Sequence, residues 1–235
     1  MSKKQTERCI LEKFVSNAKG GFRIALITDS ETPDFVIKTF EKKKISIELT
    51  RLINPELKEK EQFRTAIVER ARDLFREKYS ANLEVHVVFE NRIIKCKKTE
   101  IDKYAKQILE IVESIYVPLQ NFEFRVSSHN TIFTHENFDS IFISNELGFT
   151  NWQTFGAYIV DKVNFNWLKK IVSQKEENIK RYRETFDENW LLLTSTFGTK
   201  SSSFHFDYIN FDELQTKFDR VYVYKYFEDS IIEVK

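Results

Sequence analysis

Along the first 90 residues, apolar positions either alternate with polar ones or recur every three to four residues. Alternation predicts strands, because successive side chains of a strand point to opposite faces, and the longer repeat predicts helices. Gly20-Gly21 and the polar run at 42–44 separate the segments. The pattern predicts the order helix, three strands, helix, strand, over residues 3–18, 22–28, 34–40, 44–50, 55–79 and 83–89.

The remaining residues continue this mixture of helices and strands. We predict helices over 99–115 and 165–184, and short strands near 122–126, 140–144, 156–161, 190–194 and 219–226. No internal repeat, low-complexity segment or linker rich in Pro, Gly or Ser interrupts the chain. We therefore expect an α/β fold with a mixed sheet in a single domain over residues 1–235. Residues 1–90 would form its core, and residues 91–235 would extend the same domain and its sheet.

Composition limits the class of protein. Of the 235 residues, 41% are hydrophobic and 31% are charged, which is typical of a globular chain. The 37 basic residues nearly balance the 36 acidic ones, which disfavours non-specific coating of nucleic acid but permits a local basic groove. There is no signal-peptide core in residues 1–13, no apolar run near the roughly 18 residues of a membrane span, and only Cys9 and Cys96 as cysteines. These features predict a cytoplasmic protein with reduced thiols and no membrane partner.

Two acidic residues fall on neighbouring predicted strands. In the strand 44–50, Ser46, Glu48 and Thr50 share one face. Asp34 begins the preceding strand, and a short hairpin would bring its carboxylate beside that of Glu48. Mg²⁺ and Mn²⁺ prefer such oxygen ligands, and the bound ion polarises a phosphodiester and lowers the pKa of an attacking water. Asp34 and Glu48 are therefore candidate metal ligands and catalytic residues, and Ser46 and Thr50 are expected to line the same site.

This motif and the order of the predicted elements resemble a known family. Pro33-Asp34 followed by Glu48-Leu49-Thr50, within an αβββαβ order, is similar to the PD-(D/E)XK, or restriction-endonuclease-like, superfamily. Thr50 stands at the motif lysine, as in uncharacterised relatives with an E-x-T ending. The resemblance implies a restriction-endonuclease-like core and a Mg²⁺- or Mn²⁺-dependent nuclease that acts on DNA rather than RNA, in restriction or defence. Many nucleases of this fold act as dimers, so a homodimer is compatible with the resemblance.

Glu7 is a further acidic candidate. On the first predicted helix it lies within the apolar face of Ile10, Leu11 and Phe14, where an unpaired carboxylate would be costly. The superfamily often places a helix glutamate at its metal site, so the resemblance implies that Glu7 is a third metal ligand. The alternative is that Glu7 lies on a frayed first turn and contacts water.

Two cations on apolar helix faces are candidates for the site. Lys175 lies near the centre of the apolar stripe of helix 165–184, and our hypothesis is that it supplies the catalytic ammonium that Thr50 cannot. The alternative for Lys175 is a side chain that reaches solvent, or a structural ion pair. Arg64 leans toward the apolar face of helix 55–79, where it could line the site as a partner of a phosphate or of a motif acid.

The connection at 90–98 is basic. Its cations could bind phosphates beside the site, because phosphate contacts need only positioned charge, although a solvated loop is the alternative. The four residues are Arg92, Lys95, Lys97 and Lys98.

Three functions stay open at this point. The first is a metal-dependent nuclease. The second is a catalytically inactive protein of the same fold that binds nucleic acid or a protein partner, and the third is a structural subunit of a larger complex.

Overall fold

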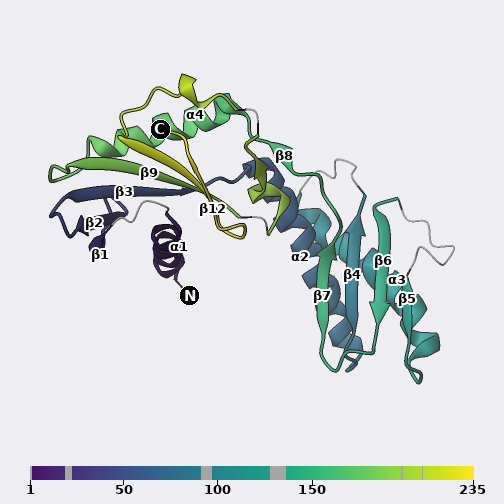
Figure 1. The fold of residues 1–235 in the computed structure, drawn as a ribbon. Helices are drawn as coiled ribbons and strands as arrows, with labels where there is room; N and C mark the ends of the chain where they lie inside the picture. The colour runs from purple at the N-terminus through teal and green to yellow at the C-terminus, as the bar shows by residue number, and fades with distance from the viewer. Residues whose placement is uncertain (1, 19–22, 91–96, 128–135, 197, 208) are drawn as a thin grey trace. The chain divides into compact units, whose positions relative to one another are not determined.

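The computed structural model describes residues 2–18, 23–90, 97–127, 136–196, 198–207 and 209–235. The chain forms two compact units (Figure 1). Met1–Asn54 and Ile159–Lys235 together make the discontinuous unit, and Pro55–Tyr158 make the inserted unit. No helix in the described ranges is long and apolar enough to span a membrane.

The discontinuous unit is built on a six-stranded mixed sheet. Its strand order is β1-β2-β3-β9-β11-β12, in which β3, β9 and β11 are parallel neighbours and the other pairs are antiparallel. Two short strands, β8 and β10, pair separately. The elements are α1 (Lys3–Asn17), β1 (Ile24–Asp29), β2 (Phe35–Thr39), β3 (Lys44–Arg51), β8 (Asp161–Lys162), α4 (Phe165–Ile179), β9 (Glu188–Ser195), η3 (Lys200–Ser202), β10 (Phe204–His205), η4 (Phe211–Glu213), β11 (Arg220–Lys225) and β12 (Ser230–Glu233).

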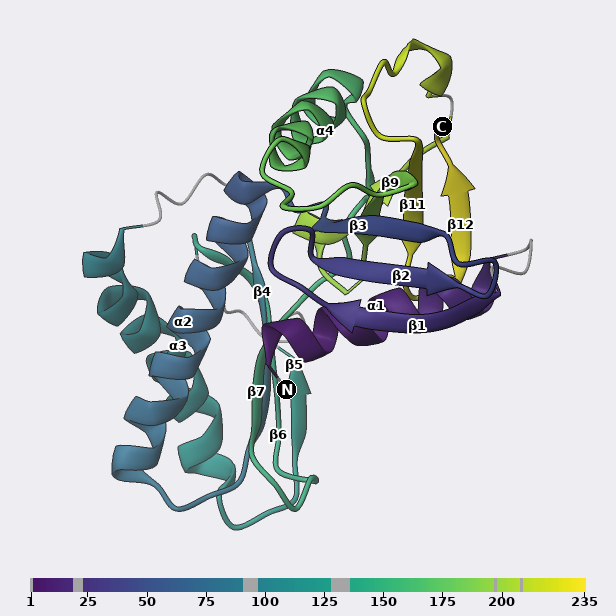
Figure 2. The same cartoon turned by 90° about the vertical axis from the view of Figure 1, so that its left-hand side faces the viewer.

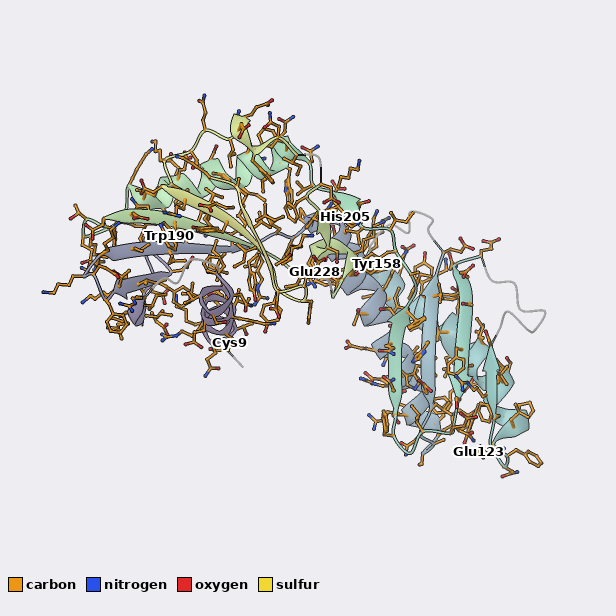
Figure 3. All side chains as sticks on the ribbon, viewed as in Figure 1. Cys9, Glu123, Tyr158, Trp190, His205 and Glu228 are labelled. Atoms are coloured by element: carbon orange, nitrogen blue, oxygen red, sulfur yellow. The ribbon has the colours of Figure 1, made fainter. Side chains whose placement is uncertain are left out.

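One helix covers each face of this sheet, as Figures 1 and 2 show. The apolar face of α1 packs against the odd-numbered residues of β3, including Ile47 and Leu49, and against Trp190 of β9 (labelled in Figure 3). On the other face, Leu168 and Val172 of α4 pack against Leu191 and its neighbours. Because β9 contributes apolar side chains to both clusters, it reads as a continuous hydrophobic run, as expected of a central parallel strand.

The inserted unit has its own sheet and core. Four strands in the order β5-β6-β4-β7 carry two helices on one face (Figure 2). Its hydrophobic cluster contains residues of this unit alone. The elements are α2 (Pro55–Lys78), β4 (Glu84–Phe89), η1 (Lys98–Glu100), α3 (Ile101–Leu119), β5 (Arg125–Ser127), β6 (Phe138–Ser144) and β7 (Asn151–Phe155).

The structure therefore shows a mixed α/β fold, but the contiguous core expected over residues 1–90 is wrong in one respect. The strand 83–89 does not join the first three strands, since β4 pairs with β6 and β7 in the other sheet. The parallel neighbour of β3 is β9, which pairs in register from Ile45↔Glu188 to Arg51↔Thr194. The apolar face of β4 is used instead against the helices of the inserted unit.

Two further predictions need correction, whereas most other elements are found within a few residues of the predicted positions. The strand predicted near 156–161 is wrong: β7 ends at Phe155, and Gly156 follows with φ 142°, a backbone conformation that only glycine adopts readily. The helix predicted to 184 ends at Ile179. The expectation that C-terminal strands extend the first sheet is confirmed by β9, β11 and β12.

Candidate functional site

Glu48 is the centre of the candidate site. It lies on the face of β3 opposite Ile47 and Leu49, and its side chain is only 2% exposed. Its carboxylate accepts three hydrogen bonds: from Lys175 Nζ at 3.2 Å and Asn178 Nδ2 at 2.9 Å on Oε2, and from Tyr182 Oη at 3.2 Å on Oε1. A buried carboxylate is tolerated when it is paired and hydrogen-bonded in this way.

Helix α4 and the residues directly after it bring the three donors to Glu48. Asn164 caps its N-terminus through its side-chain oxygen, which accepts from Trp167 N at 3.1 Å. Leu168 and Val172 then fix the apolar stripe of the helix on the sheet. Lys175 and Asn178 follow on the same side at helical spacing, and Tyr182 lies just beyond the helix end.

Lys175 therefore contacts the carboxylate of Glu48, the acid of the site in which it was predicted to supply the ammonium. Its side chain is 27% exposed, so the stem is largely covered while the ammonium keeps some access to water. The contact satisfies the geometric requirement of the hypothesis that Lys175 replaces the motif lysine. Both a catalytic ammonium and a structural ion pair make this contact, and the catalytic role stays a prediction.

Asp34 stands directly before β2, and its side chain is tied to β3. Its Oδ2 accepts a hydrogen bond from the backbone N–H of Leu49 at 2.8 Å, which sets this carboxylate beside the strand that carries Glu48. Lys4 of α1 donates to the backbone oxygens of Ser30 and Asp34, so the first turn of α1 holds the segment that leads into β2.

The other two predicted residues of the β3 polar face differ in their contacts. Ser46 is fully buried and donates to Asn189 Oδ1 at 2.7 Å. The hydroxyl of Thr50 is buried and has no hydrogen-bond partner among the described residues. A buried hydroxyl without a partner is uncommon, because its desolvation is uncompensated. Here the hydroxyl lies on the same strand face as Glu48.

The phenol of Tyr182 is influenced by the negative charges of both Glu48 and Asp34. Burial raises the pKa of its phenol far above the usual value, and the negative charges of Glu48 and, more weakly, Asp34 raise it further. The phenol therefore remains protonated and acts as a hydrogen-bond donor to Glu48 across the physiological pH range.

Glu7 is buried on the apolar face of α1, at 8% exposure. Helix α1 begins at Lys3 with a capping box on Ser2, so Glu7 lies in a formed turn and the frayed-turn alternative does not hold. Its carboxylate is 3.6 Å from Lys3 Nζ. Within the described ranges, no three acidic, histidine or cysteine side chains gather closely enough to hold a metal ion, so a role for Glu7 as a third ligand stays a prediction.

The remaining candidates belong to the inserted unit. Arg64 donates to the backbone oxygen of Glu90 at 3.1 Å and lies 5.3 Å from the ring centroid of Phe89. Lys97 is exposed, and Lys98 begins η1. Arg92 and Lys95 lie outside the described residues, so the predicted phosphate contacts of this connection remain predictions.

Three partners were not predicted from the sequence: Asn178 and Tyr182 for Glu48, and Asn189 for Ser46. A signal for the first two was present, because Lys175, Asn178 and Tyr182 recur at i, i+3 and i+7 in the helix predicted over 165–184, in which Leu168 lies at i−7. Asn189 lies on a strand distant in sequence, and only the pairing of β3 with β9 brings it to Ser46.

Comparison of the chain with protein-family models, with curated proteins and with solved structures finds no match. The assignment of function therefore rests on the geometry around Glu48.

Proposed function

We propose that the discontinuous unit is a metal-dependent nuclease of the PD-(D/E)XK kind, which hydrolyses phosphodiester bonds of nucleic acid, DNA in the first instance. Glu48 and Asp34 are its acids, and Lys175 stands in for the motif lysine that Thr50 replaces. The observation that carries the proposal is the 3.2 Å contact between Lys175 Nζ and Glu48 Oε2, made by residues 127 positions apart in the chain.

The topology supports the same proposal. Apart from the short strand β8, which pairs with β10 outside the six-stranded sheet, the elements of the discontinuous unit up to β9 run α1, β1, β2, β3, α4, β9. This is the αβββαβ order of that superfamily. The acids stand where the order requires, with Asp34 at the entry to β2 and Glu48 within β3.

The donor set around Glu48 suits a hard divalent cation. Asp34 and Glu48 supply carboxylate oxygens, and the unpartnered hydroxyl of Thr50 is a further oxygen on the same strand face. When bound, Mg²⁺ or Mn²⁺ would polarise the phosphodiester and lower the pKa of the attacking water. Lys175 would hold its ammonium beside the phosphate oxygens and stabilise the negative charge that develops as water adds to phosphorus and the bridging P–O bond breaks.

Metal-dependent cleavage by the full chain tests the proposal. Supercoiled plasmid, linear duplex, single-stranded DNA and RNA are incubated with Mg²⁺, Mn²⁺ or EDTA, and Mn²⁺ binding is measured by calorimetry. We expect cleavage of at least one DNA substrate with either ion and none with EDTA. Glu48→Ala and Lys175→Met should each lower the rate by about 100-fold or more, because removal of one preorganised charge-stabilising group commonly costs this much.

The matched control is Lys170→Met, which removes an exposed lysine from the same helix. Its rate should equal that of the wild type, and circular dichroism checks that each variant is folded. Cleavage by Glu48→Ala at the wild-type rate would refute the assigned site, and failure to bind Mn²⁺ or to cut any substrate would refute the enzyme.

A second function has one observation in its favour. All three donors to Glu48 come from the protein, so this carboxylate is already neutralised and satisfied without a metal ion. A catalytically inactive protein of the same fold, which binds nucleic acid or a protein partner, would retain such an arrangement for stability alone. Absence of Mn²⁺ binding together with metal-independent binding of DNA would identify this second function.

A further inference from the structure

A cavity rich in lysine opens at the far end of the β2–β3 hairpin. It has a volume of about 510 Å³. Its lining comes from β1, from the hairpin and from the segment that precedes β9: Ala25, Leu26, Lys38, Thr39, Lys42, Lys44, Thr185 and Asp187. Leu26 is 52% exposed, so the cavity has an apolar wall beside its cations.

The cavity shares a sheet face with Glu48. Leu26, Lys38 and Lys44 form one row across β1, β2 and β3, since Leu26 pairs with Lys38 and Lys38 with Lys44. Lys44 and Glu48 are four residues apart on β3, so they point to the same face. The strand rise separates their Cα atoms by about 13 Å.

The positive charge of this cavity is incompletely neutralised. Lys44 Nζ pairs with Glu184, and Asp187 accepts from the backbone N–H of Lys44. The ammonium groups of Lys38 and Lys42 have neither an ion-pair nor a hydrogen-bond partner in the part of the chain that is described. Like charges directly opposite on neighbouring strands, as at Lys38 and Lys44, are destabilising. An anion in the cavity would relieve this cost.

Aromatic rings connect the cavity to Glu48. Tyr182 donates to Glu48, its ring centroid is 5.5 Å from that of Phe186, and Lys44 Nζ lies 5.9 Å from the Phe186 ring. Tyr182 and Phe186 therefore link Glu48 to Lys44 through successive side-chain contacts.

We propose that this cavity is a phosphate-binding subsite, in which Lys38, Lys42 and Lys44 hold the backbone of a nucleic acid strand whose scissile phosphate lies at Glu48. The inference rests on the proposed function, and it adds where a strand beyond the scissile phosphate is held. A dinucleotide carries a single internucleotide phosphate, so it cannot place one phosphate at Glu48 and another among the lysines about 13 Å away.

The test is binding of fluorescently labelled DNA by the full chain, followed by anisotropy in EDTA over a series of salt concentrations. A dinucleotide and an oligonucleotide of about ten nucleotides are compared, since only the longer one has phosphates for both Glu48 and the lysines. The variant Lys38→Glu/Lys42→Glu is compared with Lys169→Glu/Lys170→Glu, which makes the same charge change on the exposed side of α4.

We expect Lys38→Glu/Lys42→Glu to weaken binding of the longer DNA by at least about tenfold. The negative slope of log K against log salt should become smaller in magnitude by about two, because each lost phosphate contact removes nearly one unit. The control pair should bind like the wild type, and the dinucleotide should bind alike to both variants. Equal losses of DNA affinity in the two double variants would overturn the inference. So would failure of the wild type to bind the longer DNA, or displacement of that DNA by polyglutamate as effectively as by unlabelled DNA. Because this readout needs neither metal nor cleavage, its failure leaves the Glu48 tests of the proposed function standing.

Discussion

Glu48 is a carboxylate with almost no exposed surface, so the energy of its contacts should be measurable. Lys175→Met would leave the charge with only the Asn178 and Tyr182 donors. Breaking a fully buried ion pair costs about 3–5 kcal/mol, and since Lys175 is 27% exposed we expect a loss of about 1–3 kcal/mol in the free energy of unfolding. Urea unfolding at neutral pH measures it.

The double variant Glu48→Gln/Lys175→Met is the control for this prediction. A neutral amide in place of the carboxylate needs no counter-charge, so the double variant should be more stable than Lys175→Met alone. If Lys175→Met were as stable as the wild type, the pair would contribute nothing to the fold, and the contact would be retained for another reason.

Tyr224 should make stability depend on alkaline pH. Its side chain is fully buried and donates to Asp229 Oδ1 at 2.9 Å, and burial, with this hydrogen bond second, raises the pKa of the phenol to about 12. An unfolded tyrosine titrates near pH 10. Its contribution is therefore complete below about pH 10 and is lost as the pH rises toward 12, by up to about 1.4 kcal/mol per pH unit.

The variant Tyr224→Phe checks the sign. It should be less stable than the wild type by about 1 kcal/mol at neutral pH, because a hydrogen bond is lost. The difference should shrink above about pH 10, where only the wild type must ionise this group on unfolding. Parallel stability curves up to pH 12, from chemical unfolding at each pH, would contradict the assignment.

At the scale of residues, the sequence predicted which way side chains point better than it predicted their partners. Strand alternation placed Glu48 opposite Ile47, and the helical stripe placed Lys175 toward the sheet; both orientations are observed. The pairing of Glu48 with Lys175 was only a hypothesis, because local periodicity carries no information about which strand a helix crosses.

Among the elements, α4 positions the site, so its start should affect stability. Asn164→Ala removes the side-chain acceptor for Trp167 N, and we expect a loss of about 1 kcal/mol in the free energy of unfolding. Asn164→Asp keeps an acceptor at the same place and should be close to the wild type. Thermal and urea unfolding distinguish these variants, and equal losses in both would show that the cap is not the cause.

Element boundaries were predictable where a local signal exists. Helix α2 and strand β3 were found where their repeats predicted them, whereas the 156–161 strand was wrong because apolar residues there follow Gly156 without entering a sheet. The sheet to which a strand belongs has no local signal at all. For this reason the strand 83–89 is expected in one core with the first three strands, whereas the parallel neighbour of β3 is β9, more than a hundred residues further along.

At the scale of the whole molecule, the hydrophobic clusters of the two units have no residue in common. The clusters around β3 and β9 use only Met1–Asn54 and Ile159–Lys235, and the third cluster uses only Pro55–Tyr158. Neither border has the composition of a linker, so the insertion could not be predicted from local composition. With residues 55–158 and the short separate strand β8 set aside, the elements follow the αβββαβ order from α1 to β9, which is why the proposed nuclease core is discontinuous in sequence.

Because its core is self-contained, the fragment Pro55–Tyr158 should fold by itself. Trp152 is its only tryptophan and is 8% exposed, so a folded fragment should show blue-shifted emission that moves to longer wavelength in one cooperative urea transition. Val87→Asp places a charge at a fully buried position and should abolish this transition, whereas Lys106→Asp, at an exposed position of α3, should preserve it. A fragment that emits like free tryptophan without denaturant would show that the inserted unit needs the rest of the chain to fold.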